Sequence, residues 1–242
     1  MRAFTAQTRT ELLLNLRNGE QLLVSIVIPL LLLVFFSSVG VLPVPEGVAE
    51  RIDFLAPGIL ALAVMSSAMV SLGIGTGFER QYHVLKRLGA TPLGRGRWVA
   101  AKIALVLALL VIQSAVIVGV AVLLGWNPSG TPWLAPIAIL LGAAAFAGIG
   151  LLLAGTLRGP LTLAVANGLY LVLLLLGGMI VPFEEMPGAI GTLGEYSPAG
   201  ALSQVLQACL RDGAPAAGRS WAVLVVWALA MPALTIRYFR WD

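Results

Sequence analysis

The sequence contains very little charge. Its 15 Lys+Arg and 11 Asp+Glu residues make up 11% of the 242 positions, whereas soluble globular domains carry about 25% charged residues. Apolar residues reach 59%, and the mean hydropathy is +0.96. A soluble fold of this size could not bury so much apolar surface. The composition therefore excludes a soluble enzyme, a nucleic-acid-binding protein and a disordered tail, and it indicates a polytopic membrane protein.

Residues for metal and catalytic chemistry are also scarce. Cys209 is the single cysteine and His83 the single histidine, so no intrachain disulfide and no cysteine-based metal site can form. We expect Cys209 to fill apolar space and His83 to lie on a solvated surface. The carboxylates of Glu184 and Glu185 are adjacent in the chain and point apart, and a solvated outer position is expected for both. The sequence thus predicts no catalytic residue, no metal site and no cofactor bound by this chain.

Long apolar runs dominate what is present. A bilayer span takes about 17 to 25 apolar residues, and six windows free of charged residues meet that requirement: Leu22–Leu42, Phe54–Phe78, Ile103–Trp126, Trp133–Leu157, Leu161–Phe183 and Ser220–Ile236. The alternating segments of about ten residues that mark barrel strands do not occur. The first run is too long for a cleavable signal core and is expected to stay as an anchor. We predict one all-α membrane domain over residues 1–242 with six transmembrane helices, of which the sixth window is the shortest.

Basic residues predict the orientation of these spans. Six spans place both termini on one side, together with the segments around 79–102 and 158–160. That side carries twelve basic residues, and the opposite side carries three, namely Arg51, Arg211 and Arg219. Because basic loops remain in the cytosol, we expect a multi-pass protein of the cell membrane with both termini cytosolic.

Two cytosolic segments show organisation beyond charge. In residues 1–20, Phe4, Thr8, Leu12 and Leu16 recur at a spacing of four, which favours an interfacial amphipathic helix over a frayed tail. Residues 79–102 open with a short helix over 78–88 that has Tyr82 and Leu85 on one side. This segment is either a basic loop that only enforces orientation or a docking helix for a partner.

The outer segment 184–212 is too apolar for a solvated loop. Ser197 can cap a helix that has Pro198 at its first position, and a shorter helix is expected before it. Two half-helices that re-enter the membrane explain this composition, since such connections are tolerated where protein or a cavity covers them.

The expected spans contain small residues and no charge. Gly73 and Gly77 form a GxxxG pair, and Ala144 and Gly148 offer a second smooth face; both suit close helix packing. Ion-coupled carriers commonly place ionisable residues on their spans, and these windows have none. A phosphate-binding loop is also missing, and the cytosolic segments are too short for an ATPase domain. If the protein moves a solute uphill, another chain must supply the energy.

Several motifs resemble one transporter family. The run from Phe78-Glu-Arg through Leu85-Lys-Arg-Leu-Gly-Ala-Thr-Pro-Leu93, the outer Pro182-Phe and Tyr196-Ser-Pro-Ala motifs, and the terminal Arg237-Tyr-Phe-Arg-Trp241 are similar to those of ABC-2-type transporter permeases, particularly of the drug-resistance branch. The similarity covers essentially the whole chain. One departure is Gly89-Ala90, where the family often has an arginine or serine before the alanine.

The resemblance implies the membrane subunit of an ABC exporter. Such a subunit pairs with a second permease chain, identical or homologous, and sits on two ATP-binding subunits that hold ATP and Mg. It implies an ATPase-coupling role for Glu79, Arg80, Tyr82, Leu85, Lys86 and Arg87. The implied substrates are hydrophobic drugs, lipids or lipid-linked molecules. Two alternatives stay open: a polytopic scaffold or assembly-factor subunit without transport, and a passive channel, which the absence of a polar stripe disfavours.

Two further sets of residues are candidates for the transport path. The second and fifth spans combine small residues with polar or adaptable ones, namely Ser66, Ser67, Met69, Asn167 and Tyr170. These either line the path or only join helices by hydrogen bonds. An outer gate is expected at Phe183, Met186, Tyr196, Leu202 and Leu206.

Overall fold

The computed structural model describes residues 26–39, 48, 50–85, 94–214 and 217–240. Over these ranges the chain is helical and contains no strand. Five helical stretches are long and apolar enough to cross a membrane: Arg51–Gln81, Arg97–Leu123, Pro132–Thr156, Gly159–Leu176 and Gly218–Tyr238. A shorter apolar helix, α3 (Ile28–Ser38), lies within the first predicted window, whose remaining residues 22–25 and 40–42 are outside the described residues. The all-helical fold class is confirmed. The expected interfacial helix at 1–20 also lies outside the described residues.

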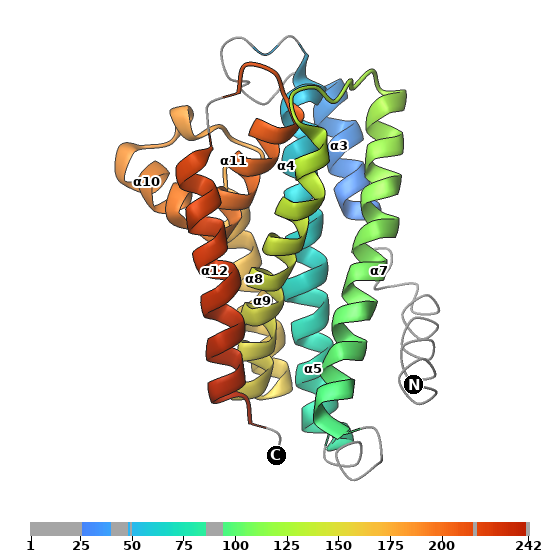
Figure 1. Ribbon diagram of the computed structural model, residues 1–242, viewed down its shortest axis with the longest axis vertical. Coiled ribbons are helices and arrows are strands. Elements are labelled where there is room, and N and C mark those ends of the chain that lie inside the picture. The colour runs from blue at the N-terminus through green and yellow to red at the C-terminus, as the bar shows by residue number, and fades with distance from the viewer. Residues whose placement is uncertain (1–25, 40–47, 49, 86–93, 215–216, 241–242) are drawn as a thin grey trace.

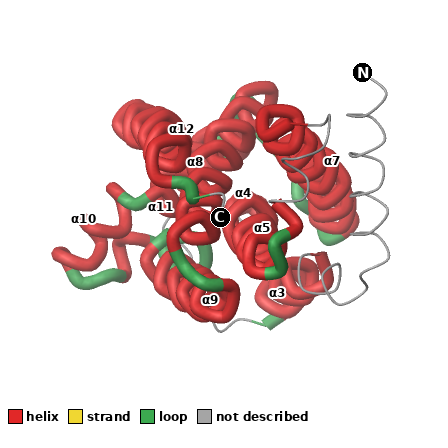
Figure 2. The backbone as a smooth tube through the Cα atoms, turned by 90° about the horizontal axis from the view of Figure 1, so that it is seen from below, coloured by secondary structure: helices red, strands yellow, loops and turns green. Residues whose placement is uncertain are grey.

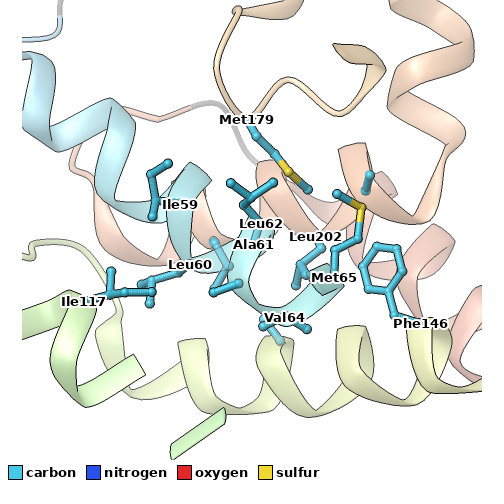
Figure 3. Close-up of a cluster of buried hydrophobic side chains, with 14 of the residues drawn as sticks. Ile59, Leu60, Ala61, Leu62, Val64, Met65, Ile117, Phe146, Met179 and Leu202 are labelled. Carbon is cyan, nitrogen blue, oxygen red and sulfur yellow. The ribbon is translucent and has the colours of Figure 1, made fainter. Parts of the chain in front are cut away.

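The stretch Arg51–Gln81 forms the centre of the bundle. It consists of α4 (Arg51–Met65), the π-helical segment η2 (Ser66–Ser71) and α5 (Leu72–Gln81), which follow one another without a break. Within its most apolar 18 residues, 89% are buried inside the bundle. Seen along the bundle, α4 and α5 lie in the middle, with α3, α7 (Gly94–Leu123), α9 (Gly159–Leu176) and α8 (Ala135–Thr156) around them (Figure 2). Figure 3 shows the apolar side chains of α4 converging with Ile117, Phe146 and Leu202 from three other helices.

Small residues allow the close approach of α8 to its neighbours. A Cβ added at Gly150 would lie 2.5 Å from the Met69 carbonyl oxygen, and one at Gly73 would lie 2.9 Å from the Gly150 carbonyl oxygen. On the other side, a Cβ at Gly148 would lie 2.7 Å from the backbone of Met231 in α12 (Gly218–Tyr238). Gly73 and Gly148 therefore do serve helix packing. Their partners are Gly150 and Met231, which sequence spacing could not reveal.

Within the described residues, two predicted span boundaries differ from the helix ends by more than five residues. The fifth span was expected to reach Phe183, but α9 ends at Leu176 because Gly178 adopts a left-handed backbone (φ 62°) and turns the chain. The following Met179 carbonyl then packs on Gly58, where a Cβ would lie only 2.2 Å away.

The third span was expected to start at Ile103, but α7 starts at Gly94. A charge-free window locates the apolar part of a helix and misses a terminus that carries charge. Lys102 illustrates this, because its side chain is only 8% exposed and is paired with Glu79. The helical turns before Ile103 and the apolar turns after it form one continuous helix.

The outer segment folds into three short helices. They are η4 (Phe183–Glu185), α10 (Gly188–Tyr196) and α11 (Pro198–Leu210). The Ser197 hydroxyl accepts a hydrogen bond from the Gly200 N–H, so it caps α11 as its position before Pro198 predicts. Most side chains of α11 are buried, and the helix packs beside α4, α8 and α12 near one end of the bundle (Figure 1).

Candidate functional site

The two ends of the bundle differ in charge. The lower end in Figure 1 holds the end of α5, the start of α7, the α8–α9 connection and the end of α12. Described basic residues there are Arg80, Arg97, Lys102, Arg158, Arg237 and Arg240, with Glu79 as the acidic residue. At the opposite end the described acidic residues are Glu50, Asp53, Glu184, Glu185, Glu195 and Asp212, with three arginines. The lower end therefore has the basic character of a cytosolic face.

Glu79 and Lys102 join α5 to α7 at this lower end. The Lys102 Nζ lies 2.5 Å from the Glu79 Oε1, and it also lies 5.6 Å from the centre of the Trp98 ring on its own helix. The side chains are 8% and 29% exposed for lysine and glutamate, respectively. Such a shielded pair resists separation, because removing one partner would leave the charge of the other partner poorly solvated.

Arg80 joins α5 to the end of α8. Its Nη1 donates to the carbonyl oxygens of Ala154 at 2.8 Å and Leu157 at 3.2 Å. These carbonyls belong to the last turn of α8 and to the residue after it, where helix carbonyls have no partner within the helix and the dipole favours a cation. Glu79 and Arg80 thus attach the end of α5 to two neighbouring helices.

The next residues divide into a buried and an exposed side chain. Leu85 is 3% exposed and packs in a small cluster with Trp98, Val99 and Phe239. Tyr82, by contrast, is 62% exposed and stacks on Phe78 with ring centres 6.2 Å apart. Of the two predicted coupling residues, Tyr82 is therefore exposed, whereas Leu85 is already covered by this chain.

The remaining predicted coupling residues, Lys86 and Arg87, lie outside the described residues. His83 is exposed and has a left-handed backbone (φ 57°) two residues after the end of α5. Among the described residues, no group of three or more His, Cys, Asp or Glu side chains could hold a metal ion.

The candidate path residues do not come together. Ser66, Ser67 and Met69 are at most 6% exposed inside the bundle. The Ser67 hydroxyl donates to the Gln113 Oε1 of α7 at 2.7 Å, which is the helix-joining role that the sequence left open. Gln113, 1% exposed, is the partner that sequence analysis missed; its signal was a long polar side chain in an otherwise apolar span.

The two path candidates on α9 have a different environment. Asn167 is exposed, and its Nδ2 donates to the Leu163 carbonyl oxygen of the same helix at 2.9 Å. Tyr170, one turn further, is partly buried. Asn167 therefore lies on a surface that another molecule can reach, whereas Tyr170 packs partly against the core.

The expected gate residues are also divided. Leu202 and Leu206 are fully buried in the core, and Leu202 packs on Gly142. The Phe183 ring packs against three glycines of the outer segment, Gly178, Gly194 and Gly200, and so holds this segment together. Tyr196 is 49% exposed and lies under the Arg219 guanidinium, 5.2 Å from ring centre to Cζ. Met186 is partly buried.

Comparison with known proteins agrees with this arrangement. Residues 2–210 match the ABC-2 type transporter family. The chain is also 29% identical to the Bacillus subtilis (strain 168) protein named "Putative transport permease YvfS" over 224 residues, which cover 89% of this chain and 88% of that protein. The family consists of membrane subunits that generally work with an ATP-binding cassette partner. With an all-helical bundle of apolar spans and a match over most of its length, the chain belongs to the ABC-2 type transporter family.

Proposed function

We propose that this chain is the permease subunit of an ABC exporter in the cell membrane. It moves a hydrophobic drug, a lipid or a lipid-linked molecule out of the cytosol or the inner leaflet. Two copies of a separate ATP-binding cassette subunit hold ATP and Mg and supply the energy, and a second permease chain, identical or homologous, completes the transporter. Both termini lie in the cytosol, since the lower end of the bundle carries most of the described basic residues.

The observation that carries this proposal is the attachment of the α5 end to two other helices. Glu79 pairs with Lys102 of α7, and Arg80 binds the last carbonyls of α8. A force applied to the segment after α5 therefore reaches three spans together. Rigid-body motion of this kind is a common way in which closure of one domain is transmitted to another.

Within this segment Tyr82 is the residue best placed to meet an ATPase. It is 62% exposed directly after α5, and exposed aromatic side chains often provide the main anchors of an interface. Lys86 and Arg87 follow it in the chain and would add steering charges at the rim. Leu85, being covered already, acts in this proposal by holding the segment against Trp98.

The path for the substrate lies along the face of α9 that carries the exposed Asn167 and the partly buried Tyr170. A carboxamide is costly against lipid tails, so this face is expected to border the second permease chain or the substrate. Ser66, Ser67 and Met69 support the path from behind, because α9 packs beside η2. The outer segment with Phe183, Met186 and Tyr196 closes the path at the other end.

A coupling assay tests this function. The chain is reconstituted into vesicles with its ATP-binding subunit, and ATP hydrolysis and uptake of a hydrophobic dye are measured. We expect Tyr82→Ala to lower chain-dependent ATP hydrolysis at least tenfold, as loss of an anchor worth about 2 kcal/mol would do. Trp133→Ala is the matched control, because Trp133 is an exposed aromatic residue (71%) at the opposite end.

Two results would contradict the proposal. If Tyr82→Ala and Trp133→Ala behave alike, the segment after α5 is not the coupling site. If the two chains copurify but no solute moves with ATP, the chain is a scaffold subunit. Collapse of the proton gradient is expected to leave transport unchanged, since the six charge-free windows contain no Asp, Glu, Lys or His for proton coupling.

A further inference from the structure

A polar pocket lies at the upper end of the bundle, beside the outer segment. It has a volume of about 490 Å³ and is bounded by the turn after α9, by α10 and α11, and by the first turn of α12. Its polar lining includes Glu184, Ser203, Gln204, Gln207, Arg211 and Ser220. The pocket is separate from the α5 end and from the exposed face of α9.

Two polar groups of this pocket lack a partner within the described chain. Gln207 is 7% exposed, and its Nε2 donates to the Phe54 carbonyl oxygen at 2.7 Å, whereas its Oε1 accepts no hydrogen bond. The Arg211 Nη1 is also buried without an acceptor. Buried donors and acceptors are normally satisfied, so an unpaired carbonyl and an unpaired guanidinium nitrogen in one pocket point to a ligand. That ligand must offer both a hydrogen-bond donor and an anion.

Other groups of the pocket also suit a ligand that has an anionic and a cationic part. The first turn of α12 lines the pocket, and its N-cap residue, Ala217, provides no side-chain cap; such a helix terminus favours an anion. Glu184, which is exposed, provides a carboxylate for a cation. Burial lowers the pKa of the Arg211 guanidinium, while Glu184 and Asp53 raise it. Glu195 and Arg219 pair with each other, so their charges cancel.

We propose that this pocket binds the phosphoethanolamine head group of a membrane lipid. The phosphate lies against Arg211 and the start of α12, and the ammonium group donates to the Gln207 Oε1 and to Glu184. A choline head group has no N–H donor for the glutamine, and a glycerol head group has no cation for Glu184. This lipid is a bound component of the subunit, distinct from the transported molecule.

The position of the pocket favours a lipid over a free phosphate compound. In the proposed orientation the pocket lies at the outer end of the spans, where we expect lipid head groups to meet the apolar region. Helix α10, whose Glu195 lines the pocket, also exposes the apolar side chains of Ile190 (44%) and Leu193 (69%). These side chains provide a surface for the acyl chains of the same lipid.

Lipid binding to the purified full-length chain tests the proposal. Phosphatidylethanolamine, phosphatidylcholine and phosphatidylglycerol with identical acyl chains are titrated into the detergent-solubilised protein, and retention is measured by native mass spectrometry. We expect phosphatidylethanolamine to bind at least tenfold more tightly than the other two. Glu184→Gln should reduce its affinity to that of phosphatidylcholine, whereas Arg211→Gln should weaken both of these lipids about tenfold.

Matched variants and a soluble probe make the result decisive. Glu185→Gln and Arg51→Gln change neighbouring exposed or half-buried charges outside the pocket lining and should leave all three affinities unchanged. Soluble O-phosphoethanolamine should bind at least tenfold more weakly than the lipid; equal or tighter binding would refute a lipid source. Equal affinity for the three lipids, or equal effects of Glu184→Gln and Glu185→Gln, would refute the site. If Arg211→Gln fails to fold, the comparison of Glu184→Gln with Glu185→Gln still tests the site, because both glutamates are exposed.

Discussion

The contact between α8 and the π-helical segment η2 is sensitive to a single methyl group. A Cβ at Gly150 would lie 2.5 Å from the Met69 carbonyl oxygen and 3.1 Å from the Met69 Cα. Both atoms are backbone, so no side chain can rotate away. Since real Cβ atoms essentially never approach below 3.0 Å, Gly150→Ala must move the two helices apart by 3.0 − 2.5, or 0.5 Å, at this point.

The magnitude follows from the loss of packing along this contact. A gap of about 0.5 to 1 Å removes roughly a quarter to a half of each dispersion contact, and an added methyl in a tightly packed site costs about 1 to 3 kcal/mol. For a chain of this length each kcal/mol lowers Tm by about 2 to 4 °C. We therefore expect Gly150→Ala to lower Tm by about 2 to 12 °C.

Gly75→Ala is the matched control for this variant. Gly75 lies on α5, and a Cβ there would meet nothing within 4 Å. Because alanine favours a helix over glycine by up to about 1 kcal/mol, this variant should be neutral or slightly stabilising. Thermal unfolding of both variants is followed by circular dichroism in the same detergent. Equal Tm values for Gly150→Ala and the parent protein would refute the close contact between α8 and η2.

Three further predictions concern single contacts and topology. In a double-mutant cycle, Ser67→Ala and Gln113→Leu should show a coupling energy of about 0.6 kcal/mol, and at most about 1.7 kcal/mol; additive effects on the free energy of unfolding would contradict their hydrogen bond. Lys102→Met should lower the free energy of unfolding by about 1 to 3 kcal/mol, because it removes the ammonium group that shields Glu79, whereas the exposed Arg158→Met should change it by less than about 0.5 kcal/mol. In a Cys209→Ala background, an impermeant maleimide added outside whole cells should label Thr192→Cys but not Thr156→Cys. Both are exposed threonines bonded to a carbonyl one turn earlier, at opposite ends of the bundle, so the reverse labelling pattern would overturn the orientation.

The sequence predicted the features that depend on local composition. Charge-free runs located the five long apolar helices, because lipid admits only apolar helices with internally bonded backbones. Ser197 before Pro198 predicted the start of α11, because a hydroxyl there caps the first N–H groups. The motif from Phe78 to Leu93 identified the family, which the match over residues 2–210 confirms.

The sequence alone could not show which side chains of distant segments meet. The spacing of Tyr82 and Leu85 placed both on one face, yet only the packing of Leu85 on Trp98 separates them into an exposed and a buried side chain. Likewise Ser67 could line a path or join helices until the structure brought it to Gln113, 46 positions away. The pocket around Gln207 and Arg211 is enclosed by segments that lie far apart in the sequence, from Phe54 to Ser220. Local sequence determines whether a segment forms a helix and enters the membrane, because that depends on its own residues; which polar groups meet depends on the long-range packing of helices, and only the tertiary structure decides it.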